Sequence, residues 1–71
     1  MRAAMTAPTR AQVFEARGAV VRARTEFRRG TISYDQLAVI VDRYADLVVA
    51  RAKALGLPTR RPSKNYLLRA L

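Results

Sequence analysis

Apolar side chains recur every three to four residues along two long stretches of the chain, which is the spacing of an α-helix with one buried face. The second stretch, residues 34–55, has the wider apolar face. The stripe of the first stretch, residues 10–29, consists of Val13, Ala16, Val20, Ala23 and Phe27. The chain is therefore predicted to be all-α, with two helices of similar length.

Local signals predict where these helices begin. Thr9 and Ser33 each stand directly before an apolar-periodic stretch, and Gln12 and Gln36 follow them three residues later. This is the spacing of a capping box, in which the hydroxyl and the amide side chain each bond the backbone of the other residue. We expect both helices to begin at these positions.

Two glycines predict where the helices end. Gly30 follows two arginines, which suit the negative end of a helix dipole. Gly56 stands before Leu57 and Pro58, a pattern typical of a Schellman stop. Because so short a segment joins the two helices, they are predicted to form an antiparallel hairpin over residues 9–57.

The apolar face of the second helix covers roughly 220° of its circumference, which is more than a single neighbouring helix can bury. We expect the remainder to meet apolar residues of the C-terminal segment and a second copy of the chain, so that the protein is a homo-oligomer, with a symmetric dimer favoured. The candidate oligomer or partner face consists of Val41, Ala45, Val48, Val49 and Ala52.

The two ends of the chain differ from the hairpin. Residues 1–8 show no periodicity and are predicted to be a flexible N-terminal leader. Residues 58–71 form a basic tail in which Ser63 is placed to cap a short C-terminal helix. A helix of fewer than about 12 residues holds only through tertiary packing.

Positive charge dominates the chain and is distributed unevenly. Fourteen Lys and Arg stand against five Asp and Glu, a net charge of +9. Residues 10–29 and 56–71 carry +4 each, whereas residues 34–55 are neutral. Such a chain is expected to bind nucleic acid, an anionic membrane or an acidic protein surface. The partner is expected to contact the first helix and the tail, where the charge lies.

Four arginines of the first helix fall on one line along it, because intervals of seven and four residues return to the same side. They are Arg10, Arg17, Arg24 and Arg28. A line of positive groups suits nucleic-acid phosphates. The alternative is that these arginines border the hairpin or dimer interface and pair with Glu15, Glu26, Asp42 or Asp46. Residues 10–29 contain six arginines and two glutamates. Pairing within this helix therefore cannot neutralise all of its arginines.

A second basic cluster surrounds the start of the predicted third helix. It consists of Arg60, Arg61, Lys64 and Arg69. Unpaired backbone N–H groups at a helix start would add to an anion site there. The alternative is a solvated basic tail. A helix-turn-helix over residues 52–71 is disfavoured by Pro58 and Pro62.

Enzymatic function is not indicated. The chain has no Cys and no His, and its acids occupy positions explained by helix starts and exposed faces. No metal and no cofactor are expected. No run approaches the ~18 apolar residues of a membrane span, and no apolar signal segment opens the chain, so we expect a cytoplasmic location. We expect no binding at a membrane surface either, because arginines interrupt the apolar face.

Three segments carry recognisable local patterns. Residues 26–37 have a helix–Gly–Thr–Ile–Ser–helix pattern, residues 54–57 an Ala-Leu-Gly-Leu helix stop, and residues 61–63 a basic Arg-Pro-Ser helix start. In these segments the chain resembles small uncharacterised helical-hairpin proteins of phages that infect high-GC bacteria. The resemblance implies a phage accessory role in the host cytoplasm and carries no functional residues over.

Two hypotheses follow for the function. The leading one is a non-enzymatic module that binds nucleic-acid phosphates with little sequence specificity through the first helix and the tail. The alternative is a host-protein interaction or assembly protein that uses the surplus apolar face of the second helix.

Overall fold

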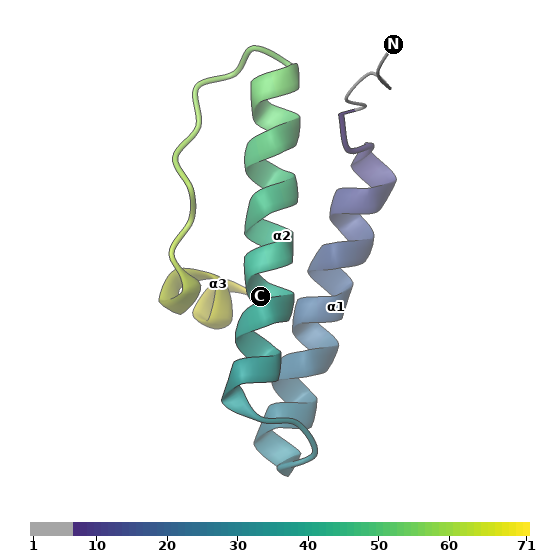
Figure 1. Ribbon diagram of the computed structural model, residues 1–71, viewed down its shortest axis with the longest axis vertical. Coiled ribbons are helices and arrows are strands. Elements are labelled where there is room, and N and C mark those ends of the chain that lie inside the picture. Colours follow the sequence, from purple (N-terminus) through teal and green to yellow (C-terminus); the bar gives the residue numbers. More distant parts are fainter. Residues whose placement is uncertain (1–6) are drawn as a thin grey trace, which may run out of the picture.

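The computed structural model describes residues 7–71 and contains three α-helices: α1 (Arg10–Arg29), α2 (Tyr34–Ala54) and α3 (Lys64–Ala70). No strand occurs in this part of the chain. In Figure 1, α1 and α2 lie side by side and are joined at the bottom of the view by the short connection before Tyr34, while α3 lies beside the lower half of α2. The predicted all-α class is confirmed.

Both predicted capping boxes are present. The hydroxyl of Thr9 accepts a hydrogen bond from the backbone N–H of Gln12 at 3.1 Å, and the Gln12 side chain accepts one from the Thr9 N–H at 2.8 Å. Ser33 and Gln36 repeat this arrangement with the same two distances. Each box satisfies N–H groups that have no partner within the helix, which fixes the starts of α1 and α2.

Both predicted glycine stops are also present. Gly30 has φ +81° and Gly56 has φ +72°, the left-handed conformation that a side chain disfavours. After α1, the N–H of Thr31 donates to the carbonyl of Glu26 at 3.0 Å; after α2, the N–H of Leu57 donates to that of Ala52 at 2.9 Å. In each bond the donor follows the acceptor by five residues, which is the Schellman pattern. The chain turns away from the helix axis at this point.

The core is small and lies where the three helices meet. Its largest fully buried side chains are Val20 of α1 and Leu37 and Val41 of α2. Ala23, Ala45 and Leu67 complete the buried cluster. The small alanines on both long helices allow α1 and α2 to pack closely, and Leu67 of α3 covers the same cluster.

The C-terminal tail returns along α2 and does not extend into solvent. From the end of α2, the chain runs back beside that helix to α3, where the Ser63 hydroxyl accepts a hydrogen bond from the Tyr66 N–H at 3.1 Å (Figure 1). The predicted cap of the third helix is thereby confirmed. Leu67 is only 4% exposed, so α3 is held by the tertiary packing that so short a helix requires.

The predicted leader, residues 1–8, lies mostly outside the described residues. Its last residue, Pro8, is half-buried, and its carbonyl oxygen accepts a hydrogen bond from Arg51 Nη1 at 3.1 Å. The chain is therefore already tied to α2 one residue before the cap of α1.

Candidate nucleic-acid interface

The exposed side of α1 holds most of the predicted arginine line. Arg10, Arg17 and Arg28 are all exposed. None of them forms an ion pair with any residue between positions 7 and 71, a range that contains every Asp and Glu of the chain. The alternative in which these arginines pair with nearby acids is not what the structure shows, and the three guanidinium groups remain available to an external anion.

Arg24 departs from the prediction because the tail covers it. Its side chain is half-buried, and Nη1 donates a hydrogen bond to the carbonyl oxygen of Leu68 at 2.6 Å. Periodicity places Arg24 in line with the other three arginines, but it lies at the level where α3 docks. Arg24 therefore holds the tail and is not part of the exposed line.

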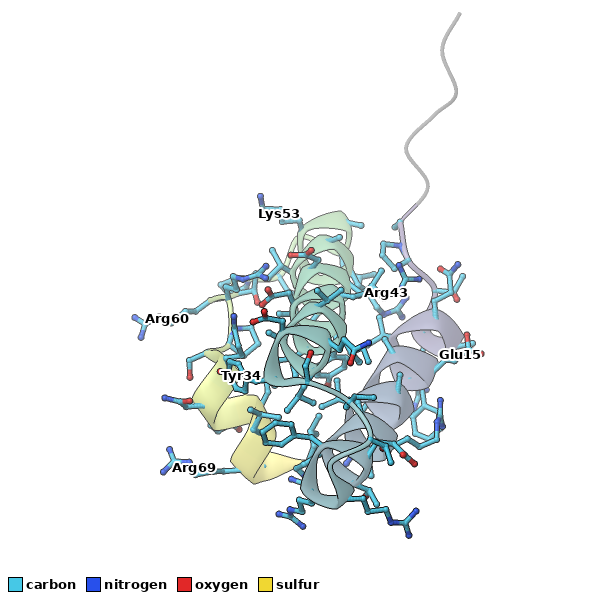
Figure 2. All side chains as sticks on the ribbon, turned by 60° about the horizontal axis from the view of Figure 1, so that its bottom comes forward. Glu15, Tyr34, Arg43, Lys53, Arg60 and Arg69 are labelled. Carbon is cyan, nitrogen blue, oxygen red and sulfur yellow. The ribbon has the colours of Figure 1, made fainter. Side chains whose placement is uncertain are left out.

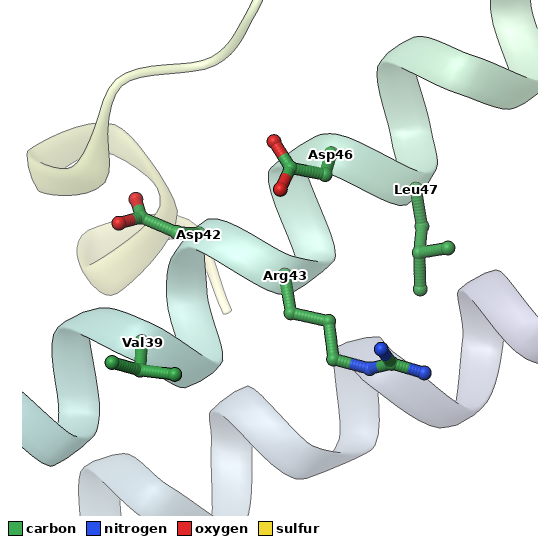
Figure 3. Close-up of a pocket in the computed structure, with 5 residues that line it drawn as sticks. All are labelled: Val39, Asp42, Arg43, Asp46 and Leu47. Carbon is green, nitrogen blue, oxygen red and sulfur yellow. The ribbon is translucent and has the colours of Figure 1, made fainter.

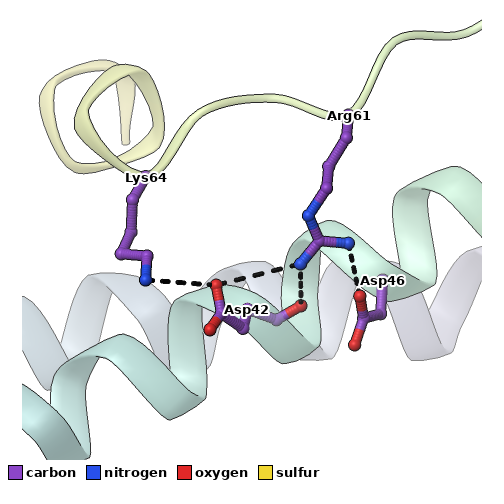
Figure 4. A network of polar contacts seen from close by, with 4 residues as sticks. All are labelled: Asp42, Asp46, Arg61 and Lys64. Atoms are coloured by element: carbon purple, nitrogen blue, oxygen red, sulfur yellow. Dashed lines mark hydrogen bonds and ion pairs between the residues drawn. The ribbon is translucent and has the colours of Figure 1, made fainter.

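Two cations of the predicted tail cluster are paired with α2. Figure 4 shows Arg61 between Asp42 and Asp46, with Lys64 also facing Asp42. The ion-pair distances to Asp42 are 3.8 Å from Arg61 and 3.6 Å from Lys64. Arg61 also donates to the Asp42 backbone carbonyl at 3.5 Å. These contacts hold the segment before α3 against α2 and neutralise much of the local charge.

The other two cations of the cluster are free of such contacts. Arg60 and Arg69 are exposed and form no ion pair within residues 7–71. In Figure 2 both side chains project outward from the side of the molecule that carries the tail. The predicted cluster is therefore divided into two structural cations, Arg61 and Lys64, and two available ones.

The sequence reasoning missed three further exposed arginines. Arg22 and Arg29 lie seven residues apart on the other edge of the exposed side of α1, a spacing that the sequence already contained. Arg29 lies 3.9 Å from Glu26, with both side chains largely in solvent. Arg22 lines a hollow of about 340 Å³ between α1 and α2 together with Arg43, and Ala16 and Ala19 contribute to its walls.

Arg43 of α2 also lines a second surface hollow of about 440 Å³. Figure 3 shows its side chain extending toward α1, while Asp42 and Asp46 point the other way, toward the tail. The acids are thus directed at Arg61 and Lys64 and not at a common reaction centre. Within the described residues there is also no group of three potential metal ligands.

The predicted partner face is only partly accessible. Val41 and Ala45 are 1% and 2% exposed, because α1 and α3 cover them within one chain; their assignment to a partner surface was wrong. Val48, Val49 and Ala52 are half-buried. Val48 and Ala52 line an apolar hollow of about 180 Å³ near the end of α2, together with Val13, Leu55 and Leu57.

None of the helices described is long and apolar enough to cross a membrane. No family model, curated protein or solved structure matches this chain.

Proposed function

We propose that this chain is a non-enzymatic, antiparallel helical hairpin that binds nucleic-acid phosphates with little sequence specificity through the exposed side of α1. The observation that carries the proposal is the line formed by Arg10, Arg17 and Arg28, three exposed guanidinium groups without an acidic partner between positions 7 and 71. Arg60 and Arg69 add positive charge on the tail.

Binding of this kind is driven by electrostatics. Each arginine that meets a phosphate releases a condensed counterion, so binding becomes favourable without any reading of base edges. Guanidinium groups are suited to this role because they stay charged and present several donors to phosphate oxygens. Two of the acids, Asp42 and Asp46, are directed at the tail and not at the cations of α1. Within residues 7–71, the one ion pair of an α1 arginine is that of Arg29 with Glu26, at 3.9 Å.

A titration by fluorescence anisotropy tests the proposal. Labelled duplexes of unrelated sequence should bind with similar affinity, and the affinity should fall steeply between about 50 and 200 mM salt. Arg17→Gln should reduce the slope of log K against log salt by about 0.9, the contribution of one phosphate contact. Lys53→Gln, which removes the same charge from an exposed site on α2, should leave the slope unchanged. Absence of duplex binding at ~50 mM salt would contradict the proposal.

A second candidate function is protein association through the apolar hollow at the end of α2, with a second copy or a host protein as the partner. It is supported by Leu55 and Leu57, which are 57% and 56% exposed at this hollow. Sedimentation equilibrium distinguishes this role: a dimer of the unmodified chain that dissociates in Leu57→Asp supports it for self-association. A monomer at all concentrations leaves only a heterologous partner, because the same face cannot then join two copies.

A further inference from the structure

Phe14 is an exposed aromatic residue on the same side of α1 as the arginines. It is 70% exposed, more than any other large hydrophobic residue in the described part of the chain. The other phenylalanine, Phe27, packs edge-to-face on Tyr34 with 6.0 Å between ring centroids, whereas Phe14 has no aromatic partner among residues 7–71. A single exposed apolar residue is ordinary in itself, so its surroundings decide whether it carries information.

Those surroundings are basic. Residues three and four positions away are the neighbours of a side chain on a helix, and for Phe14 these include Arg10 and Arg17. Both are exposed and without an acidic partner between positions 7 and 71. They lie roughly 10 Å apart along the helix axis, and Phe14 lies between them in height along that axis.

Gly18, four residues after Phe14, is another of these neighbours. It has no side chain of its own to cover the helix backbone one turn beyond the ring. Glycine inside a helix costs about 1 kcal/mol relative to alanine, so the sequence gives up stability at this position. A Cβ at Gly18 would lie 3.2 Å from Nη1 of Arg22, which means that the guanidinium of Arg22 extends over the glycine. A flat ligand against Phe14 would therefore lie beside a further cation, the guanidinium of Arg22 above Gly18.

An aromatic ring between phosphate-binding cations is the arrangement with which proteins hold single-stranded nucleic acid, because every base has a face that can stack on the ring. In a duplex the base faces are covered by their neighbours and the ring has nothing to stack on. We propose that Phe14 stacks on an unpaired base of a single strand while Arg10 and Arg17 contact the adjoining phosphates. This inference rests on the proposed nucleic-acid binding and adds a preference for single strands.

A tryptophan in place of Phe14 supplies a direct probe, because the chain contains no Trp. Phe14→Trp should show strong quenching of its fluorescence when a single-stranded 12-nucleotide oligothymidylate is added, since stacking brings the indole against a base. Val39→Trp is the matched control: Val39 is 68% exposed, but lies on α2. Its fluorescence should change little with the same oligonucleotide.

Affinity provides the second readout. Phe14→Ala should weaken binding of the oligothymidylate about tenfold, within the range known for loss of one stacked base. Binding of a duplex with the same number of phosphates should change less than twofold, because its contacts are electrostatic. Helix content by circular dichroism should be unchanged, since the side chain is mostly in solvent.

The outcomes separate the two proposals. If the unmodified chain does not bind the duplex at ~50 mM salt, the proposed function is overturned, and if it does not bind the oligothymidylate either, the stacking inference is overturned with it. If it binds both, but Phe14→Trp is not quenched or Phe14→Ala weakens the two equally, the stacking inference alone is overturned. Quenching at position 14 together with a selective loss of single-strand affinity supports both.

Discussion

Arg24 on α1 and Leu68 on α3, 44 positions apart in the chain, are joined by a hydrogen bond of 2.6 Å from the guanidinium to the backbone carbonyl. The carbonyls in the last turn of a helix lack partners within it, and a cation there also interacts favourably with the helix dipole. No other side-chain hydrogen bond joins α1 to α3 among residues 7–71. This contact and the burial of Leu67 hold α3 against α1 and α2.

Removal of this donor should loosen α3 without unfolding the hairpin. Arg24→Met keeps an unbranched side chain but loses a charged hydrogen bond, with an expected cost of about 1–2 kcal/mol. Hydrogen exchange followed by mass spectrometry should show faster exchange of the amides of residues 67–71. Arg17→Met, at an exposed position without such a bond, should cost less than about 0.5 kcal/mol and leave the tail amides protected. Equal exchange in the two variants would show that the Arg24 contact does not hold α3.

Asp46 and Asp42 form ion pairs with Arg61 and Lys64, and under the proposed function these pairs would compete with external phosphates for the two cations. Asp46→Asn should therefore raise affinity for nucleic acid, because the guanidinium of Arg61 is partly released and the net charge rises by one. Asp35→Asn is the matched control, since it changes the charge equally at an exposed residue that forms no ion pair within residues 7–71.

Anisotropy titrations at two salt concentrations distinguish these effects. If the gain comes from Arg61, Asp46→Asn should increase the steepness of the salt dependence by up to about 0.9 relative to Asp35→Asn. The same increase in both variants would mean that only net charge matters. Stability should change by less than about 1 kcal/mol, because this ion pair is half-exposed and screened.

The helix boundaries were predictable because their determinants are local. A capping box needs two residues three positions apart, and a Schellman stop needs a glycine with an apolar residue after it. These requirements are met by residues close in sequence at Thr9, Ser33 and Gly56. The structure shows each hydrogen bond that the two patterns predict there. The apolar period likewise predicted the core side of α1 through Ala16, Val20 and Ala23, although Phe27 of the same stripe is 39% exposed.

The division of the arginines into available and structural groups was not predictable, because it depends on where the tail runs. Arg24 and Arg17 are equivalent on a helical wheel, and only the docking of α3 distinguishes them. Arg61 contacts Asp46 across 15 positions of chain that contain Gly56 and Pro58. The burial of Val41 and Ala45 has the same origin, since Leu67 of the tail supplies the cover that a second copy was expected to supply.

The core between α1 and α2 can be tested with two leucines, Leu37 inside α2 and Leu55 at the cap that ends it. Leu37 is 1% exposed, and Leu37→Ala should destabilise the fold by about 2–4 kcal/mol through lost burial and a residual cavity. Leu55 is 57% exposed, and Leu55→Ala should cost less than about 0.5 kcal/mol. Urea unfolding followed by circular dichroism measures both. Similar midpoints for the two variants would contradict the position of the core.

The same substitution at two glycines should have opposite effects. Gly18 lies inside α1, and an added methyl group would meet only the end of the flexible Arg22 side chain, so Gly18→Ala should stabilise the fold by about 0.5–1 kcal/mol. Gly30 has φ +81°, which alanine disfavours, so Gly30→Ala should destabilise by about 1 kcal/mol although nothing lies within 4 Å of the new Cβ.

Thermal unfolding reports both effects, since a change of 1 kcal/mol moves Tm by about 4–8 °C in a domain of this size. Gly18→Ala also tests the stacking inference. If a stacked base lies against the backbone of Gly18 beside Phe14, the variant should gain stability but lose single-strand affinity. Its duplex affinity should stay the same. A gain in stability with unchanged single-strand affinity would mean that the bare backbone at Gly18 plays no part in binding, and stacking on Phe14 would then have to occur on the side of the ring that faces Arg10.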